Sequence, residues 1–172
     1  MIEIKDFIRD IPDFPKPGIL FKDITPLLKS PDALTETFKQ LAAPFHDSGI
    51  DVVAGTESRG FMFGIGVAQA LGVGFVPIRK KGKLPAETYS ESYDLEYGTD
   101  TLEIHQDAIT KGQKVLLVDD LLATGGTMSA TAKLVQSCGG EVVSCAFVIE
   151  LSFLSGAEAL TGLNTHSLIQ YQ

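Results

Sequence analysis

The feature that most limits the fold is a series of uninterrupted apolar runs separated by segments with helical spacing. The apolar runs predict buried strands at 50–55, 72–78, 114–120 and 141–150. Alternation of apolar and polar residues predicts one half-buried strand at 101–105. Apolar residues at helical spacing predict helices over 31–48, 59–72 and 128–138. Continuous buried strands alternating with helices are typical of an α/β, doubly wound, mainly parallel sheet flanked by helices. Ligands bind at the carboxyl ends of the strands in such sheets.

No repeat or linker divides the chain, so we expect residues 1–172 to form a single domain. Residues 1–30 differ in character, because four prolines (Pro12, Pro15, Pro17 and Pro26) exclude a long helix there. We expect this segment to form an irregular arm, or hood, over the core.

The charge of the chain limits its partners. The formal net charge is -8, which repels phosphate backbones and anionic lipid. No stretch approaches the roughly 20 apolar residues of a membrane span, and the first ten residues lack the apolar core of a secretory signal. We therefore expect a cytoplasmic protein with no nucleic-acid or membrane partner.

The segment VLLVDDLLATGGTM, residues 115–128, joins a predicted strand to a predicted helix. Asp119 and Asp120 lie where the strand ends, and two adjacent carboxylates cannot share an apolar site without a large desolvation cost. At least one of them must therefore meet solvent, a cation or a hydroxyl ligand.

The residues that follow these acids are suited to binding an anion; they are Ala123, Thr124, Gly125, Gly126 and Thr127. Glycines let successive backbone N–H groups approach an anion closely, and we expect Thr127 to be the N-cap of the next helix. A phosphate site beside two carboxylates predicts a ribose 5-phosphate ligand, whose hydroxyls the acids would bind. The segment lacks the lysine of a P-loop and the GxGxxG of a dinucleotide fold, and an ordinary acidic turn before a capped helix remains an alternative.

This segment resembles the phosphoribosyl pyrophosphate signature of the type I phosphoribosyltransferases. Five further segments resemble the adenine-using members of that family, in family order: FPKPGILFKDITPLL, GTESRGFMFG, PIRKKGKLP, YDLEYG and SLIQYQ. The resemblance spans nearly the whole chain. It implies the fold of that family, with an N-terminal hood and a flexible catalytic loop over 79–97. It also implies Mg²⁺-dependent transfer of the 5-phosphoribosyl group from phosphoribosyl pyrophosphate to adenine, giving AMP and pyrophosphate in purine salvage.

The resemblance also implies roles for individual residues. It assigns the ribose 5-phosphate to Asp119, Asp120 and 123–127, and catalytic roles to Glu96, as a proton carrier near the base, and Arg59. The pyrophosphate residues that it implies are Glu57, Ser58, Arg59, Arg79, Lys83 and Tyr97. The adenine residues are Leu20, Phe21, Lys22 and Leu151, and Lys22 stands where many relatives have arginine. Mg²⁺ would be held mainly by pyrophosphate, with Asp119 and Asp120 as the candidate protein ligands.

Two features of the sequence support this assignment. Four of the 14 cationic side chains lie within residues 79–83, after a predicted strand, where they could neutralise a pyrophosphate. Residues 84–93 are polar and without periodicity, so we expect a mobile loop that closes over the ligands and excludes water; a long surface hairpin is the alternative.

Other functions stay open at this point. A relative that acts on xanthine, guanine or orotate would share the donor site. A non-catalytic sensor of phosphoribosyl pyrophosphate would need a DNA-binding segment, for which the chain leaves no room, and a protein-interaction domain would leave the acids, glycines and cations unexplained. The apolar run RGFMFGIGV has more large side chains than one core face requires, and together with the resemblance it predicts a homodimer.

Overall fold

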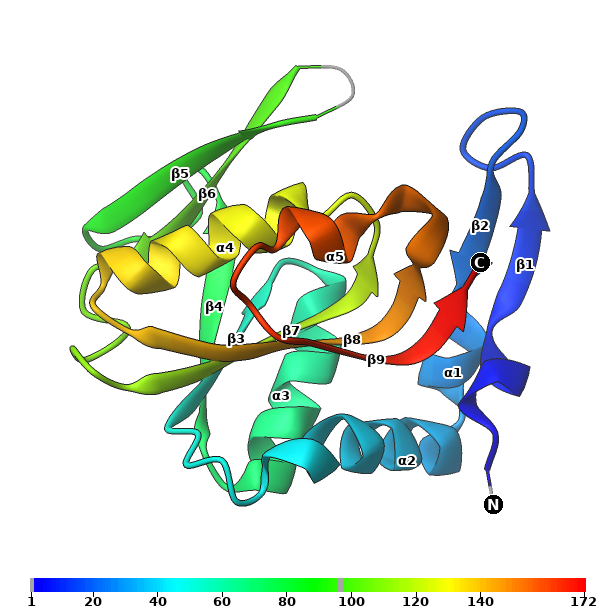
Figure 1. Cartoon of the computed structure of the whole chain (residues 1–172), viewed down its shortest axis with the longest axis horizontal. Coiled ribbons are helices and arrows are strands. Elements are labelled where there is room, and N and C mark those ends of the chain that lie inside the picture. Colours follow the sequence, from blue (N-terminus) through cyan, green and yellow to red (C-terminus); the bar gives the residue numbers. More distant parts are fainter. Residues whose placement is uncertain (1, 96–97) are drawn as a thin grey trace.

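The computed structural model describes residues 2–95 and 98–172, and its centre is a seven-stranded mixed sheet (Figure 1). The strand order is β5-β6-β4-β3-β7-β8-β9. The five strands from β4 to β9 are parallel, whereas β6 pairs antiparallel with both β4 and β5. The strand bounds are Val52–Thr56 (β3), Gly74–Lys80 (β4), Thr88–Asp94 (β5), Thr99–His105 (β6), Lys114–Leu122 (β7), Glu141–Leu151 (β8) and Thr165–Tyr171 (β9).

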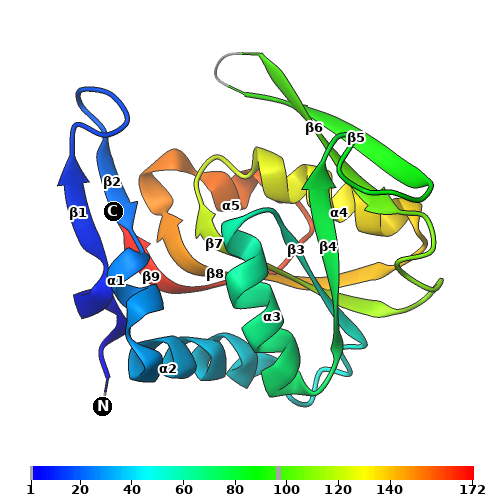
Figure 2. The same cartoon turned by 180° about the vertical axis from the view of Figure 1, so that it is seen from behind.

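Helices cover both faces of this sheet (Figures 1 and 2). On one face lie α2, Pro31–Ala42, and α3, Arg59–Leu71; on the other lie α4, Gly126–Ser137, and the short α5, Gly156–Ala159. The expected doubly wound arrangement is confirmed. Helix α2 is shorter than the helix expected over 31–48, because Pro44 lies in a 3₁₀ turn over Ala43–Phe45 that follows it.

Burial on both faces explains why the central strands are apolar throughout. In β7, Val115 and Leu117 pack into the core beneath α4, whereas Leu116 and Val118 pack into the core beneath α2 and α3. All four of these side chains are fully buried. Alternate residues of one strand therefore supply two different cores, which leaves no position for a polar side chain until the strand reaches Asp119.

Two glycines of α3 allow the helix to pack closely against its neighbours, which explains why glycine is present inside a helix. A Cβ added at Gly64 would overlap the ring of Phe75, and one added at Gly66 would overlap the ring of Phe38. The helix therefore lies nearer to β4 and α2 than an alanine at either position would permit.

The N-terminal arm is more regular than the prolines predict. Strands β1, Arg9–Pro12, and β2, Leu20–Asp23, form a separate antiparallel hairpin, which we call the hood. A 3₁₀ turn over Ile4–Phe7 precedes the hood and α1, Thr25–Lys29, follows it, so that it stands beside the end of β9 (Figure 1). The prolines are compatible with this hairpin because Pro12 ends β1, and Pro15 and Pro17 lie in the connection.

Of the two expectations for 84–93, the structure has the surface hairpin from Thr88 onward. Residues Thr88–Asp94 form β5 and pair with β6 at all seven positions, from Thr88↔His105 to Asp94↔Thr99. Backbone pairing to β6 holds this polar strand in place, and Tyr93 packs against the core beneath α4. The β5–β6 hairpin projects from the edge of the sheet (Figure 1). Glu96 and Tyr97, which sequence resemblance assigns to catalysis and pyrophosphate binding, lie outside the described residues.

Candidate active site

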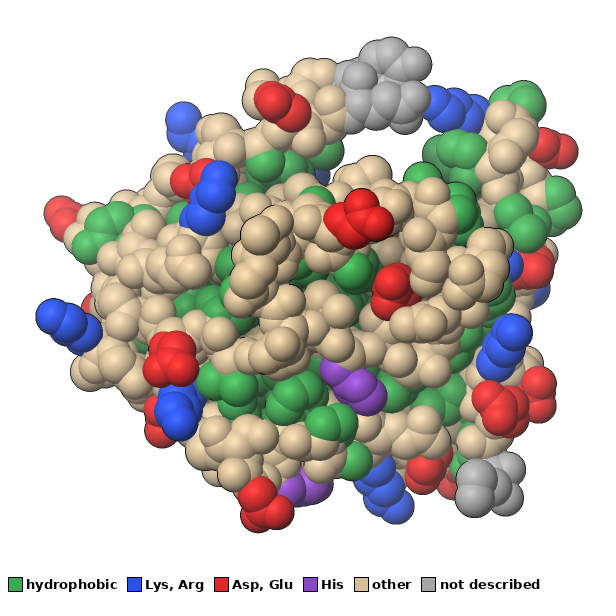
Figure 3. Space-filling model, in the orientation of Figure 1, with side chains coloured by type: hydrophobic (Ala, Val, Ile, Leu, Met, Phe, Trp, Pro, Cys, Tyr) green, Lys and Arg blue, Asp and Glu red, His purple; other side chains and the backbone are tan. Residues whose placement is uncertain are grey.

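A cavity of about 470 Å³ lies at the carboxyl ends of the strands, where the fold predicts a ligand. Four parts of the chain line it: the β3–α3 loop over 56–59, the end of β4, the β5–β6 hairpin, and the segment 119–128 that joins β7 to α4. Figure 3 shows the surface hollowed between the β5–β6 hairpin and the hood. The cavity thus collects polar groups from distant parts of the sequence.

The predicted phosphate loop forms one wall of the cavity. Ala123, Thr124, Gly125, Gly126 and Thr127 all line it, and α4 begins at Gly126. The expected cap at Thr127 is wrong: Gly125 is the N-cap, with a φ of 85°, and Thr127 is already inside the helix. Only glycine adopts this backbone conformation without strain, so the helix begins earlier than the threonine suggests. The N–H groups of the first turn of α4, which lack partners within the helix, therefore border the cavity.

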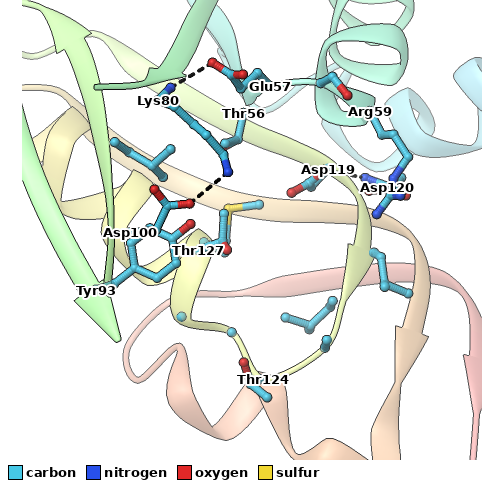
Figure 4. A pocket seen from close by; sticks show the side chains of 18 residues that line it. Thr56, Glu57, Arg59, Lys80, Tyr93, Asp100, Asp119, Asp120, Thr124 and Thr127 are labelled. Carbon is cyan, nitrogen blue, oxygen red and sulfur yellow. Dashed lines mark hydrogen bonds and ion pairs between the residues drawn. The ribbon is translucent and has the colours of Figure 1, made fainter. Parts of the chain in front are cut away.

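The two adjacent acids take different positions (Figure 4). Asp120 is 6% exposed, and its Oδ2 forms an ion pair with Arg59 Nε at 2.6 Å. Asp119 is partly buried, and its Oδ1 accepts a hydrogen bond from the backbone N–H of Asp120 at 2.8 Å. Burial and the neighbouring Asp120 raise the pKa of Asp119 well above the usual range of a carboxyl. Because Arg59 pairs with Asp120, Asp119 is the acid that an incoming hydroxyl or cation can stabilise.

Glu57 organises the other predicted anion site. Its carboxylate accepts hydrogen bonds from the backbone N–H of Lys80 at 2.8 Å and from Lys83 Nζ at 2.7 Å, and Arg79 Nε lies 3.4 Å away. Burial raises the pKa of Glu57, but the bonds from Lys83 and Lys80 and the charge of Arg79 outweigh it and lower the pKa overall. Glu57, Ser58 and Arg59 line the cavity, and the Glu57–Ser58 peptide bond is cis.

The basic cluster over 79–83 contributes one cation to the cavity lining, Lys80, which is not among the pyrophosphate residues expected from the sequence. Arg79 and Lys83 are turned toward Glu57 and lie outside the cavity lining, whereas Lys80 lines it. Lys80 Nζ forms an ion pair with Asp100 Oδ2 at 3.0 Å (Figure 4). Asp100 and Tyr93, its neighbour across the hairpin, also line the cavity. Alternation along β4 could have separated Arg79 from Lys80, but no local signal singled out Asp100 or Tyr93.

The predicted adenine residues gather beside this cavity rather than in its lining. Leu20, Phe21 and Lys22 lie on β2 of the hood, and Leu151 ends β8. The guanidinium of Arg59 lies 6.0 Å from the centre of the Phe21 ring, so Arg59 bridges the hood and the acids of β7. Leu20 is 50% exposed, and hydrophobic side chains face the hollow from the hood (Figure 3).

The side chain of Lys22 already has two partners. Its Nζ lies 2.7 Å from Asp10 Oδ1 and 3.8 Å from the centre of the Tyr171 ring. The side chain is only 8% exposed. These contacts fasten the hood to β9, so the side chain of Lys22 connects two strands instead of pointing into the cavity.

The donor set of the cavity fits a shared magnesium ion. Mg²⁺ prefers oxygen ligands and usually takes one or two carboxylates together with substrate phosphates. Asp119 and Asp120 supply carboxylate oxygens in the cavity, whereas residues 2–95 and 98–172 contain no group of three or more side chains that could enclose a metal by themselves.

Within the same residues, no helix is long and apolar enough to cross a membrane.

Comparison with known proteins gives one consistent result. The Phosphoribosyl transferase domain family matches residues 24–156. Adenine phosphoribosyltransferase of Yersinia pestis (strain Pestoides F) is 59% identical over 170 residues, which are 98% of this chain and 91% of the relative. The crystal structure of adenine phosphoribosyltransferase from Thermoanaerobacter pseudethanolicus is 57% identical, has a TM-score of 0.95 and covers 98% of both chains. The enzyme from Giardia lamblia, complexed with 9-deazaadenine, is 37% identical with a TM-score of 0.93 over 100% of this chain and 99% of that one. The chain therefore belongs to the type I phosphoribosyltransferase family, and within it to the adenine phosphoribosyltransferases.

Proposed function

We propose that the chain acts in purine salvage by transferring the 5-phosphoribosyl group from phosphoribosyl pyrophosphate to adenine, with AMP and pyrophosphate as products. The observation that carries this proposal is the convergence of the phosphate loop, two carboxylates and two cations, Arg59 and Lys80, on one cavity in a chain so similar to adenine phosphoribosyltransferases. The alternative purine and pyrimidine substrates lack a comparable argument. Initial rates with adenine, hypoxanthine, guanine, xanthine and orotate test the choice of base.

The donor would be held at its phosphate and its sugar by different parts of the β7–α4 segment. The 5-phosphate accepts hydrogen bonds from the N–H groups over 123–127 at the start of α4, and the hydroxyl of Thr124 or Thr127 can add a donor. The ribose hydroxyls donate to Asp119 and Asp120, whose carboxylates accept only. Such a contact also favours the ionised form of Asp119, which burial disfavours.

The pyrophosphate would be held on the opposite wall. Arg59 and the backbone over 57–59 are placed to neutralise it, and Lys80 adds a cation that lines the cavity. Glu57 would support this wall indirectly, because it fixes Lys83, Arg79 and the backbone of Lys80. Arg79, Lys83 and Tyr97 remain proposed pyrophosphate residues. Mg²⁺, when bound, supplies positive charge that stabilises the leaving pyrophosphate, with Asp119 and Asp120 as its candidate protein ligands.

The base would lie between the hood and the end of β8. Leu20, Phe21 and Leu151 offer apolar surface there, and the Phe21 ring faces Arg59. Catalysis itself needs little from the protein beyond placing adenine behind the anomeric carbon, excluding water and neutralising the leaving group, and Arg59 contributes the last of these. We assign to Glu96 the removal of the adenine proton, a general-base contribution of about 10²- to 10⁴-fold.

The two acids of β7 give the most direct test of the donor site. An Asp119→Ala/Asp120→Ala variant should show a large rise in KM for phosphoribosyl pyrophosphate, together with a fall in kcat, in a steady-state assay of AMP formation. Glu141→Ala is the matched control, because Glu141 is an exposed acid at the opposite, amino end of β8. Wild-type donor affinity and rate in the double variant would contradict the assignment.

A further inference from the structure

Asp100 occupies a position that no step of the transfer explains. It lies near the start of β6, opposite Tyr93 of β5, and its carboxylate is only 23% exposed. Its Oδ2 lies 3.0 Å from Nζ of Lys80. Hydrogen bonding from Lys80 holds the pKa of Asp100 below its usual range and raises the pKa of Lys80, and a hydrogen bond from Tyr93 acts on Asp100 in the same direction. The pair is therefore fully ionised at neutral pH.

The pair is placed inside the cavity rather than on the outer surface. Lys80, Asp100 and Tyr93 all line the cavity, on the side where Thr127 and the start of α4 lie (Figure 4). The backbone of Lys80 is fixed by its N–H bond to Glu57, so the main freedom left to this residue is where its side chain points. Asp100 sets that direction.

The hairpin that carries Asp100 also contacts the proposed phosphate loop. Tyr93 Cδ2 lies 3.6 Å from the place of a Cβ at Gly126, and the carbonyl oxygen of Asp94 lies 3.8 Å from it. Gly126 is the first residue of α4, where the donor phosphate would bind. Asp100 therefore belongs to a hairpin that contacts the start of α4 and also pairs with Lys80.

We propose that Asp100 is a positioning residue that competes with the pyrophosphate group for Lys80, and so weakens binding of the donor and of the product pyrophosphate. A pyrophosphate oxygen that binds Lys80 Nζ must displace the Asp100 carboxylate, and it also meets repulsion from that carboxylate. When the anion takes Lys80, Asp100 loses its partner and the β5–β6 hairpin loses an anchor. The leaving of pyrophosphate restores the pair, which favours product release. This inference rests on the proposed function of the cavity.

The test is a direct titration of pyrophosphate in the presence of Mg²⁺ into the full chain and into Asp100→Asn, which keeps the shape of the side chain and removes its charge. A partly exposed ion pair contributes up to about 1 kcal/mol, so Asp100→Asn should lower the Kd for pyrophosphate by about two- to fivefold. The KM for phosphoribosyl pyrophosphate should fall with it, and the KM for adenine should stay constant. The gain should shrink as the salt concentration rises, because the competing charges are screened.

Two further variants separate competition for Lys80 from a general effect of the hairpin. Glu91→Gln removes a similar pair from the same hairpin, since Glu91 Oε1 lies 3.0 Å from Lys133 Nζ outside the cavity lining, and it should leave the Kd unchanged. In a Lys80→Met background, Asp100→Asn should produce a clearly smaller gain. Unchanged or weaker pyrophosphate binding by Asp100→Asn, or an equal gain in Glu91→Gln or with Lys80→Met, would overturn the inference. A wild-type chain that binds no pyrophosphate would overturn the proposed function as well.

Discussion

At the scale of single residues, the burial of Asp119 next to Asp120 makes the ionised form of its carboxyl unfavourable in the folded chain. Folding raises its pKa through burial and through Asp120, so the folded chain holds this proton more tightly than the unfolded chain does. The contribution to stability is full below the ordinary carboxyl pKa and is lost as the pH rises through the raised, folded value. At neutral pH an ionised Asp119 therefore destabilises the protein.

We predict that Asp119→Asn raises the stability while it impairs donor use. Asparagine keeps the Oδ1 that accepts from the N–H of Asp120, and it removes the charge, so we expect a gain on the order of 1 kcal/mol at pH 7, or about 2–4 °C in Tm. Thermal unfolding in metal-free buffer measures it, and the gain should disappear below the ordinary carboxyl pKa. Asp120→Asn, which breaks the pair with Arg59, should give no gain. An equal or lower Tm for Asp119→Asn at pH 7 would refute the prediction.

At the scale of elements, the packing of α3 on α2 depends on the absence of a side chain. We predict that Gly66→Ala lowers the free energy of unfolding by about 1–3 kcal/mol, because the new Cβ overlaps the Phe38 ring, although alanine favours a helix by about 1 kcal/mol. Urea unfolding measures the loss. In a Phe38→Leu background the smaller side chain leaves room, so the same substitution should be nearly neutral. An equal loss in both backgrounds would show that the ring is not the cause.

The sequence predicts the elements whose signals are local and misses those that depend on distant partners. Helices α2, α3 and α4 and the buried strands follow from apolar spacing, and the proposed phosphate loop can be picked out because its acids, glycines and threonines are contiguous. Strand β5 carries polar residues and exists because it pairs with β6, so periodicity misses it. Periodicity also misses strand β9, because its sequence, THSLIQY, has neither a continuous apolar run nor a strict alternation of apolar and polar residues. Lys80, Tyr93 and Asp100 meet only because β4, β5 and β6 are neighbours in the sheet, which no local pattern reveals.

At the scale of the whole molecule, the proposed sites for the donor and the base lie on different parts of the fold. The cavity proposed to bind the donor lies at the ends of the strands of the large sheet, whereas the proposed base site depends on the hood, which is a separate two-stranded sheet. Arg59 joins the two, since it pairs with Asp120 and lies over Phe21. Arg59 is the first residue of α3, so we expect a contact that holds α3 from outside also to hold the connection between the hood and the sheet.

The exposed face of α3 leads to a prediction about the assembly of the molecule. Met62 and Ile65 are 40% and 48% exposed and lie three residues apart, on one side of a helix whose opposite side is buried. If this face holds a homodimer together, as the sequence predicts, Ile65→Glu should convert a particle of twice the chain mass of 18.4 kDa into one of 18.4 kDa. Light scattering after size-exclusion chromatography, over a range of concentrations, measures the change. Leu154→Glu is the control, because Leu154 is also 40% exposed but lies beyond β8, and it should leave the mass unchanged. A wild-type monomer, or a dimer that survives Ile65→Glu, would exclude this face as the interface.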